Sequence, residues 1–451
     1  MLADTTAART AVLNNRSLPA LRRRVRVPEY DRTTLTPAVV HLGVGGFHRA
    51  HQAVYLDDLA NQGETGWGEV GVGLRSPAMR DALLPQDCLF TVVERGRGGD
   101  RARVLGAMTR YLFGPDDPGA VLDALAAPHT RVVTLTITGG GYPLAGGEFS
   151  AADPDVRADL AAPRVPRTVF GYVVEALARR RRAGLPAFTV LSCDNLPDNG
   201  AAARAAVLGL AERRAPGLAA WIETHASFPA SMVDRITPET GDALRELVVR
   251  RFGVPDRWPV AAEPFSQWIV ADQFCAGRPP LDRVGVRFVD DVAPYRLLKT
   301  RLLNGCHSAI GYLGALAGGY RTTSDVLADP VFAGYLAALM RTEIAPVLRP
   351  VLGIDVEAYQ RTLLGRFANP RISDPLSRLC ARGSTKMPAY LLPSLIDARR
   401  RGRPSELLTL AVAAWFRYLR GSAADGSRID VADARAGRLQ TLAAADDPRA
   451  L

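Results

Sequence analysis

Residues 38–48 have the sequence Ala-Val-Val-His-Leu-Gly-Val-Gly-Gly-Phe-His, and this stretch decides the fold. The apolar run 38–43 predicts a short buried strand, and helical spacing of apolar residues follows as far as Leu59. Glycines between a strand and a helix allow a tight turn in which the backbone approaches a pyrophosphate at the helix N-terminus. The usual third glycine is His48 here, so a purely structural turn remains the alternative.

Strands and helices alternate beyond this turn. Strand-like runs occupy 69–74, 131–138 and 187–193, and a helical pattern occupies 168–182. Alternation of this kind predicts an α/β fold with a parallel sheet.

The character of the chain changes near residue 294. Helical patterns dominate after that point, over 295–314, 331–348, 389–401 and 407–419. We therefore predict a Rossmann-like dinucleotide-binding domain over residues 1–294, followed by a mainly α-helical substrate domain over residues 295–451.

Composition narrows the class of protein. The 451 residues are 47% apolar and 23% charged, which is ordinary for globular proteins and excludes a mostly disordered chain. No apolar run is long enough to span a membrane and no signal peptide is evident, so we expect a cytoplasmic protein without a membrane partner. Five isolated cysteines show neither zinc-site spacing nor a disulfide framework, so no metal is expected: Cys88, Cys193, Cys275, Cys306 and Cys380.

The formal net charge of +10 raises the question of a nucleic-acid partner. The longest basic run, Arg179–Arg182, lies at the end of the predicted helix 168–182, where cations favour the helix C-terminus. We interpret it as a solvated helix end. No RNA-binding aromatic signature or zinc-finger spacing accompanies the basic residues, so no nucleic-acid partner is expected.

Lysine is almost absent from this chain. Of the 56 basic residues only Lys299 and Lys386 are lysine, and all others are arginine. Lysine can lose its proton when it is desolvated, whereas arginine stays protonated. The bias therefore singles out two positions for function, with chance as the alternative.

Lys299, Asn304 and His307 lie on one predicted helix. At ~100° per residue, all three side chains can face one broad cleft. Alcohol oxidation needs a base for the hydroxyl proton, an amide can hold the oxyanion, and an imidazole can position a hydroxyl. By spacing alone, a surface lysine with a capped amide and a partly buried histidine is the better interpretation.

The second predicted strand is followed by Leu74-Arg75-Ser76-Pro77-Ala78-Met79-Arg80. An acid that would bind the ribose 2′-hydroxyl of NAD is missing until Asp81, and Arg75, Ser76 and Arg80 could instead face a 2′-phosphate. The cofactor is therefore NAD or NADP, unless these are ordinary exposed loop residues.

Four motifs in order resemble the mannitol dehydrogenase family of polyol-specific long-chain dehydrogenases: residues 42–51, 192–200, 232–238 and 299–307. The similarity extends from about residue 37 to about residue 420. It implies a nucleotide-binding N-terminal domain, a helical C-terminal domain with the active site between them, and metal-independent catalysis.

The resemblance also implies roles for single residues. Lys299 resembles the general acid/base, Asn195 and Asn304 the amide pair that binds the reacting oxygen, and His307 the residue that orients the substrate. Asp234, Arg378 and Lys386 are similar to the contacts with polyol hydroxyls. The expected cofactor-binding residues are Gly43, Val44, Gly45, Gly46, Phe47, His48, Arg49 and Arg75.

Two positions depart from the family pattern. Gly139 and Arg296 stand where members carry acids associated with proton passage to the lysine. The expected function is NAD(P)-dependent interconversion of a polyol and a ketose, with D-mannitol and D-fructose first, by a monomer or weak homo-oligomer. A hexuronate reductase of the fructuronate or tagaturonate type and a catalytically impaired dinucleotide-binding regulator are the alternatives.

Overall fold

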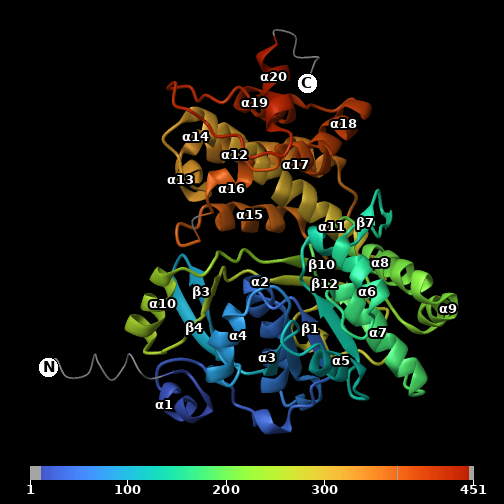
Figure 1. Cartoon of the computed structure of the whole chain (residues 1–451). Coiled ribbons are helices and arrows are strands. Elements are labelled where there is room, and N and C mark those ends of the chain that lie inside the picture. The colour runs from blue at the N-terminus through green and yellow to red at the C-terminus, as the bar shows by residue number, and fades with distance from the viewer. Residues whose placement is uncertain (1–11, 373, 446–451) are drawn as a thin grey trace. The chain divides into compact units, whose positions relative to one another are not determined.

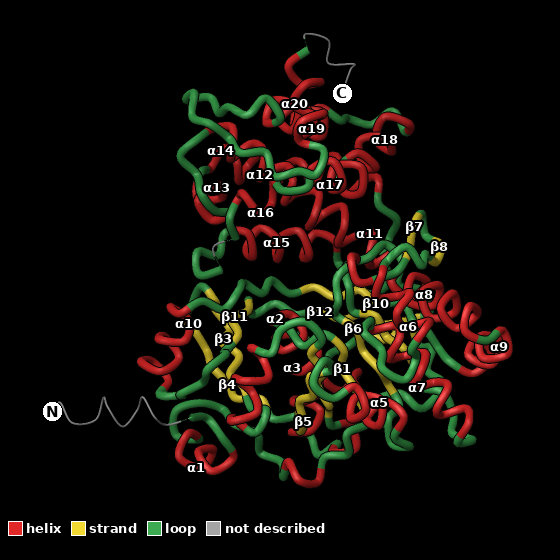
Figure 2. The backbone as a smooth tube through the Cα atoms, in the orientation of Figure 1, coloured by secondary structure: helices red, strands yellow, loops and turns green. Residues whose placement is uncertain are grey.

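The structure is a computed structural model that describes residues 12–372 and 374–445. The chain forms two compact units, Met1–Val292 and Ala293–Leu451 (Figure 1). Every strand of the described residues lies in the first unit, and the second is built from helices and loops (Figure 2).

From residue 12 on, the first unit contains thirteen strands: β1 (Val39–Leu42), β2 (Glu69–Gly73), β3 (Phe90–Gly96), β4 (Gly99–Leu105), β5 (Met108–Phe113), β6 (Val132–Leu135), β7 (Leu144–Ala145), β8 (Glu148–Phe149), β9 (Thr189–Ser192), β10 (Ser231–Asp234), β11 (Val260–Ala262), β12 (Gln267–Ala271) and β13 (Arg287–Val289). Its α-helices are α1 (Leu18–Leu21), α2 (Gly46–Ala50), α3 (Gln52–Asn61), α4 (Ala78–Leu83), α5 (Pro118–Ala126), α6 (Pro154–Ala161), α7 (Val169–Arg182), α8 (Asn199–Arg214), α9 (Pro216–His225) and α10 (Asp242–Leu247).

The central sheet is parallel, with strand order β5-β2-β1-β6-β9. This is the order of a dinucleotide-binding fold, in which successive strands are added on one side of β1 and then on the other. The predicted Rossmann-like α/β class is confirmed. Three smaller sheets complete the unit: β10-β12-β13, β11-β3-β4 and β7-β8.

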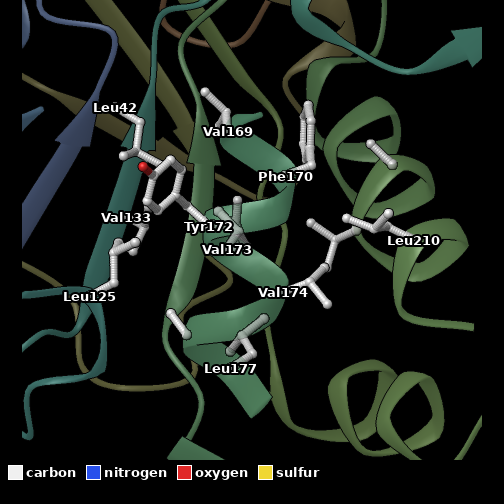
Figure 3. Packing of buried hydrophobic residues seen from close by; sticks show 14 of the residues in the cluster. Leu42, Leu125, Val133, Val169, Phe170, Tyr172, Val173, Val174, Leu177 and Leu210 are labelled. Carbon is white, nitrogen blue, oxygen red and sulfur yellow. The ribbon is translucent and has the colours of Figure 1, made fainter. Parts of the chain in front are cut away.

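β1 is buried on both faces because helices cover both sides of the sheet. Val40 and Leu42 pack with α5, α7 and α8 in one core cluster, whereas Val39 packs with residues of α3 in another. Figure 3 shows the first cluster, in which Tyr172 and Val173 of α7 lie beside Leu42 and Val133. His41 is two positions after Val39 in β1, so its side chain points to the same face of the sheet, the α3 side.

α7 matches the helical pattern predicted for 168–182, and Thr168 caps it by accepting a hydrogen bond from the Gly171 N–H. The predicted solvated end is wrong for Arg180, which is 1% exposed. Its guanidinium donates to the carbonyl oxygens of Pro186 and Ala127, 2.6 Å away in each case, so it ties the helix end to two loops.

The predicted strand 131–138 is wrong at its end, because β6 stops at Leu135. The N–H groups of Ile137 and Thr138 donate to the carboxylate of Asp194, at 3.1 and 2.7 Å. The chain therefore leaves the sheet, and Thr138 takes a left-handed conformation with φ of 64°.

The second unit contains ten α-helices in its described residues: α11 (Ala293–Lys299), α12 (Gly305–Ala317), α13 (Thr323–Ala328), α14 (Pro330–Ala338), α15 (Val356–Phe367), α16 (Leu376–Cys380), α17 (Gly383–Tyr390), α18 (Leu392–Arg400), α19 (Glu406–Tyr418) and α20 (Ala436–Ala444). α12 lies at the centre and packs against α16, α17 and α19. The Tyr312 hydroxyl of α12 donates to the Cys380 carbonyl of α16 at 3.2 Å.

None of the helices in the described residues is long and apolar enough to cross a membrane.

Candidate active site

The order of the central sheet reverses between β1 and β6. Ligands of open α/β sheets bind beyond the carboxyl ends of the strands at such a reversal, because the connecting chains diverge there. The glycine-rich turn leaves β1 at this place and leads into α2. No side chain caps the start of α2, so backbone N–H groups at its N-terminus can face an anion.

Gly43 is required by the turn itself. Its φ of 99° is unfavourable for residues with a Cβ, and a Cβ there would collide with the carbonyl oxygen of Thr136. By contrast, the nearest atom to a Cβ on Gly45 would be 3.8 Å away. The turn thus packs tightly against Thr136, which follows β6, at Gly43, and it has free space at Gly45.

His48 and Arg49 have completely buried side chains. Arg49 donates to the carbonyl oxygen of Trp258 and lies over the ring of Phe90, with 5.4 Å between the guanidinium carbon and the ring centroid. Their predicted part in cofactor binding is therefore limited to the backbone, because neither side chain reaches the surface.

A hydrogen-bonded chain supports the turn from beneath. The Thr136 hydroxyl donates to the Gly43 carbonyl at 2.8 Å, so it must accept from Nε2–H of His41, which lies 2.8 Å away. Nδ1 of His41 then accepts from the Thr134 hydroxyl at 2.7 Å. Burial holds the pKa of His41 well below its usual value, which keeps the ring neutral.

His48 stacks on His41, with 3.5 Å between ring centroids and 12° between the planes. Its Nε2 lies 2.7 Å from a carboxyl oxygen of Glu69, and both side chains are completely buried. Burial lowers the pKa of His48 to about 3 and raises that of Glu69 to about 7. The pair is thus a hydrogen bond to a neutral imidazole rather than an ion pair.

His41, His48 and Glu69 are also the one group of three potential metal donors found in the described residues, with donor atoms within 4.8 Å. The geometry opposes chelation. Imidazole lone pairs lie in the ring plane, so two stacked rings direct them in parallel instead of toward one ion. Both ring nitrogens of His41 are already hydrogen-bonded to threonine hydroxyls.

Asn195 is exposed and follows β9, directly after Asp194. Asp194 is buried and accepts from the Tyr142 hydroxyl at 2.9 Å as well as from the loop after β6. The backbone that carries Asn195 is therefore held in place by the contacts of Asp194 with the residues that follow β6. Asp234 is buried at the end of β10.

Arg75 is exposed after β2 and forms no hydrogen bond or ion pair with the residues that the structure describes. Arg80 is engaged by Asp81 and Asp116. Of the two arginines expected to face a 2′-phosphate, Arg75 therefore has its donors available and Arg80 does not.

In the second unit, Lys299 is the last residue of α11 and is 6% exposed. The next residues, Thr300–Asn304, form a π-helical turn. The prediction of ~100° per residue is therefore wrong across this turn, because i→i+5 hydrogen bonding places more residues in one turn than an α-helix does. π-turns of this kind often occur at functional sites.

Asn304 is the last residue of that turn and His307 follows it, and both side chains are half-buried. The His307 ring lies 4.5 Å from that of Phe367 of α15, which holds the imidazole against an apolar surface. The side chain of Arg301, on the same turn, forms a 2.6 Å ion pair with Asp397.

Arg378 on α16 is paired with Asp374 through two guanidinium nitrogens. Lys386 on α17 donates to the carbonyl oxygens of Arg378 and Leu379, both at 2.9 Å, and so caps the end of α16. Burial and the neighbouring Arg378 and Arg382 lower the pKa of Lys386 to about 8. α16 and α17 both pack on α12, so the structure brings these two residues to the helices around His307.

Comparison with known proteins places this arrangement in a family. Residues 37–283 match the mannitol dehydrogenase Rossmann domain, and residues 291–450 match the mannitol dehydrogenase C-terminal domain.

The chain belongs to the mannitol dehydrogenase family.

Individual members are similar over nearly the whole chain. A mannitol 2-dehydrogenase of Phaeosphaeria nodorum is 45% identical over 96% of this chain and 78% of its own length. The ternary complex of Pseudomonas fluorescens mannitol 2-dehydrogenase with NAD and D-mannitol is 45% identical, with a TM-score of 0.85 over 97% of this chain and 90% of that one. A D-sorbitol dehydrogenase in substrate-free form is 38% identical, with a TM-score of 0.93 over 98% and 92%.

The buried residues whose hydrogen bonds hold the glycine turn in place were not predicted from the sequence. His41, Thr136 and Glu69 are far apart in the chain, and no spacing rule connects them. The signal that was available is a polar residue in each of two otherwise apolar strands, His41 in β1 and Glu69 in β2. A buried polar side chain in a central strand requires a partner on the same face.

The substitution Glu69→Gln tests the protonation of this network. Below pH 7 the folded protein holds a proton on Glu69 that the unfolded chain releases above about 4.5, so this carboxyl stabilises the fold at low pH and loses that effect as the pH rises through 7. Glutamine keeps a donor for His48 without titrating. We expect the variant to gain about 3 kcal/mol relative to the wild type between pH 4.5 and pH 8, measured by urea unfolding.

The titration of His48 is present in both proteins and cancels in this comparison. The exposed Glu212 provides the matched control, and Glu212→Gln should show no such dependence on pH. An identical pH dependence in Glu69→Gln and the wild type would contradict the protonated state of Glu69.

Proposed function

We propose that this protein is an NAD(P)-dependent, metal-independent polyol dehydrogenase that interconverts D-mannitol and D-fructose. The observation that carries the proposal is the glycine turn at the reversal of the sheet, in a chain 45% identical to a mannitol 2-dehydrogenase whose complex contains NAD and D-mannitol. The motifs that resemble the family include Lys299 as the acid/base and Asn195 and Asn304 as the amide pair.

The dinucleotide fits the turn because Gly43, Gly45 and Gly46 have no Cβ and no side chain caps α2. Gly43, Val44, Gly45, Gly46 and Phe47 would hold the pyrophosphate, with the backbone of His48 and Arg49. The cofactor, when bound, supplies the acceptor for the hydride that leaves the carbinol carbon.

Lys299 takes the hydroxyl proton as the hydride departs. The neutral amine is the form that can accept a proton, and lysine, unlike arginine, can adopt it. Asn195 and Asn304 donate amide N–H groups to the oxygen as its negative charge develops, and His307, held by Phe367, orients the polyol.

Asp234, Arg378 and Lys386 bind the remaining hydroxyls of the polyol. Arg378 keeps N–H donors beyond those given to Asp374, and Lys386 has a third ammonium proton beyond the two given to carbonyl oxygens. Substrate binding therefore uses donors that the fold leaves available. In this assignment residues 1–294 bind the cofactor and contribute Asn195 and Asp234 to substrate binding, and residues 295–451 contribute the other substrate contacts.

We place the enzyme in the cytoplasm as a monomer or weak homo-oligomer. Four of its five cysteines are buried free thiols, as is usual in a reducing compartment.

A substrate panel tests the proposal. Steady-state kcat/KM is measured for D-mannitol, D-sorbitol, D-fructose, D-fructuronate and D-tagaturonate with NAD and NADP, in a buffer that contains a chelator. We expect the D-mannitol and D-fructose pair to give the largest kcat/KM. A preference for a hexuronate would support the reductase alternative and overturn the polyol assignment.

One observation favours a second candidate, a catalytically impaired dinucleotide-binding regulator. Gly139 and Arg296 replace acids of the family pattern, and a Cβ on Gly139 would lie 3.0 Å from the Leu196 side chain. Cofactor binding without turnover of any substrate in the panel would identify this case.

Lys299→Arg tests the base. Arginine keeps the charge but cannot become neutral near pH 7, so kcat should fall by roughly 10²–10⁴-fold while substrate binding is better preserved. Lys386→Arg is the matched control. It should act mainly on KM, because this residue supplies donors rather than a titrating proton.

The decisive comparison is kcat of both variants across pH. A Lys299→Arg enzyme with wild-type kcat and the wild-type alkaline pH dependence would show that Lys299 is not the base. Loss of kcat in Lys386→Arg alone would assign that role to Lys386, whose pKa of about 8 permits it.

Arg75→Ala tests the choice of cofactor. The unpaired guanidinium of Arg75 can meet a 2′-phosphate, so NADP should be used well, and the variant should lose about fivefold in kcat/KM for NADP but little for NAD. Arg157→Ala, at an exposed and unpaired position of α6, controls for net charge. A wild-type preference for NAD above about a thousandfold, or ~4 kcal/mol, would contradict the role of Arg75.

A further inference from the structure

The first unit contains a cavity of about 620 Å³ that none of the candidate site residues lines. α3 forms one wall and the β3–β4 hairpin another, and Ser266 and Gly285 lie in loops at its edge. The charged residues of the wall are four arginines and two acids: Arg26, Arg101, Arg103, Arg235, Asp58 and Glu94. The wall therefore carries a formal charge of +2, from four positive and two negative side chains.

The two acids are already engaged by arginine. The carboxylate of Asp58 accepts hydrogen bonds from both terminal nitrogens of Arg103, at 2.6 and 3.3 Å. One of its oxygens also lies 3.5 Å from a terminal nitrogen of Arg26. Glu94 accepts from Arg235 at 2.7 Å. These pairs fix the arginines in place but use only a part of their N–H groups.

Arg235 shows how rigid the wall is. Its side chain is 1% exposed, and it also donates to the carbonyl oxygens of Glu263 and Ala50, at 2.9 and 2.7 Å. A guanidinium held by three different elements offers a preorganised positive charge at the cavity.

The remaining donors have no acceptor among the described residues. Nε of Arg103 is buried without a hydrogen-bond partner, although the rest of that guanidinium is paired. Arg101 is exposed beside it on β4, opposite Glu94 of β3, and its side chain forms no hydrogen bond or ion pair with the described residues. Buried donors need acceptors, so this wall is incomplete by itself.

A polar pair completes the cavity. The hydroxyls of Tyr55 and Ser266 are hydrogen-bonded to each other at 2.9 Å, and both residues line the same space. Hydroxyls can donate to and accept from the hydroxyls of a carbohydrate.

We propose that this cavity binds a small phosphorylated carbohydrate, with the phosphate at Arg101, Arg103 and Arg26 and the sugar at Tyr55 and Ser266. A phosphate group supplies several acceptor oxygens in the geometry that guanidinium groups recognise in pairs. The volume is in the range of small-molecule sites. Neither a neutral polyol nor a ketose would use the spare positive charge, so the site is separate from the one that we assign to catalysis.

Calorimetric titration of the full chain with D-fructose 6-phosphate tests the proposal. NADH and D-mannitol are present in excess so that the catalytic site is filled, and ionic strength is constant. The wild type is compared with Arg101→Gln, which removes an exposed unpaired guanidinium, and with Arg157→Gln, which removes the same charge on α6. Inorganic phosphate is titrated in parallel.

We expect saturable binding, weakened about tenfold or more by Arg101→Gln and less than about twofold by Arg157→Gln. D-Fructose 6-phosphate should bind more tightly than inorganic phosphate. Absence of saturable binding, or equal losses in both variants, would overturn the site. Equal affinity for inorganic phosphate and the sugar phosphate would overturn the role of Tyr55 and Ser266.

Discussion

The contact between Gly43 and Thr136 is the constraint on which the rest of the first unit depends. The turn after β1 passes so close to the exit of β6 that only a residue without a side chain fits. The same closeness lets the Thr136 hydroxyl hold the Gly43 carbonyl, and it places the turn at the reversal of the strand order. The position of the dinucleotide site follows from this contact.

The polar residues beneath the turn are kept uncharged by burial. His41 and His48 stay neutral, and the pKa of Glu69 is raised to about 7 by the same desolvation. A permanent buried carboxylate at this place would oppose an anionic ligand at the turn. A protonated Glu69 supports His48 without adding that charge, so the network suits a site for a pyrophosphate.

The two lysines differ in what the structure shows of them. Lys386 directs a compact ammonium at two adjacent carbonyl oxygens, a geometry that a planar guanidinium does not reproduce. Arginine elsewhere serves ion pairs, as around Glu175, which Arg179, Arg182 and Arg214 all contact. The presence of lysine rather than arginine thus has a structural reason at position 386 and a proposed chemical reason at position 299.

The sequence predicted the elements whose signals are local. β1 follows from its apolar run, the turn from its glycines and α7 from its apolar periodicity. The β4 and β5 strands were missed because their burial is irregular. The end of β6 was wrong because Asp194, 56 positions away, accepts a hydrogen bond from the Thr138 N–H. The π-turn after Lys299 and the pairing of His48 with Glu69 depend on tertiary packing, which no spacing in the sequence reveals.

The proposed function requires that hydride passes directly from the carbinol carbon of the polyol to a nicotinamide in this protein. The most direct measurement is a single turnover of D-mannitol deuterated at both carbon 2 and carbon 5, which are equivalent by the two-fold symmetry of the molecule, with mass analysis of the cofactor and the sugar. Direct hydride transfer predicts one deuterium on the reduced nicotinamide for each D-fructose formed. Reduced cofactor without deuterium, or D-fructose without reduced cofactor, would contradict it.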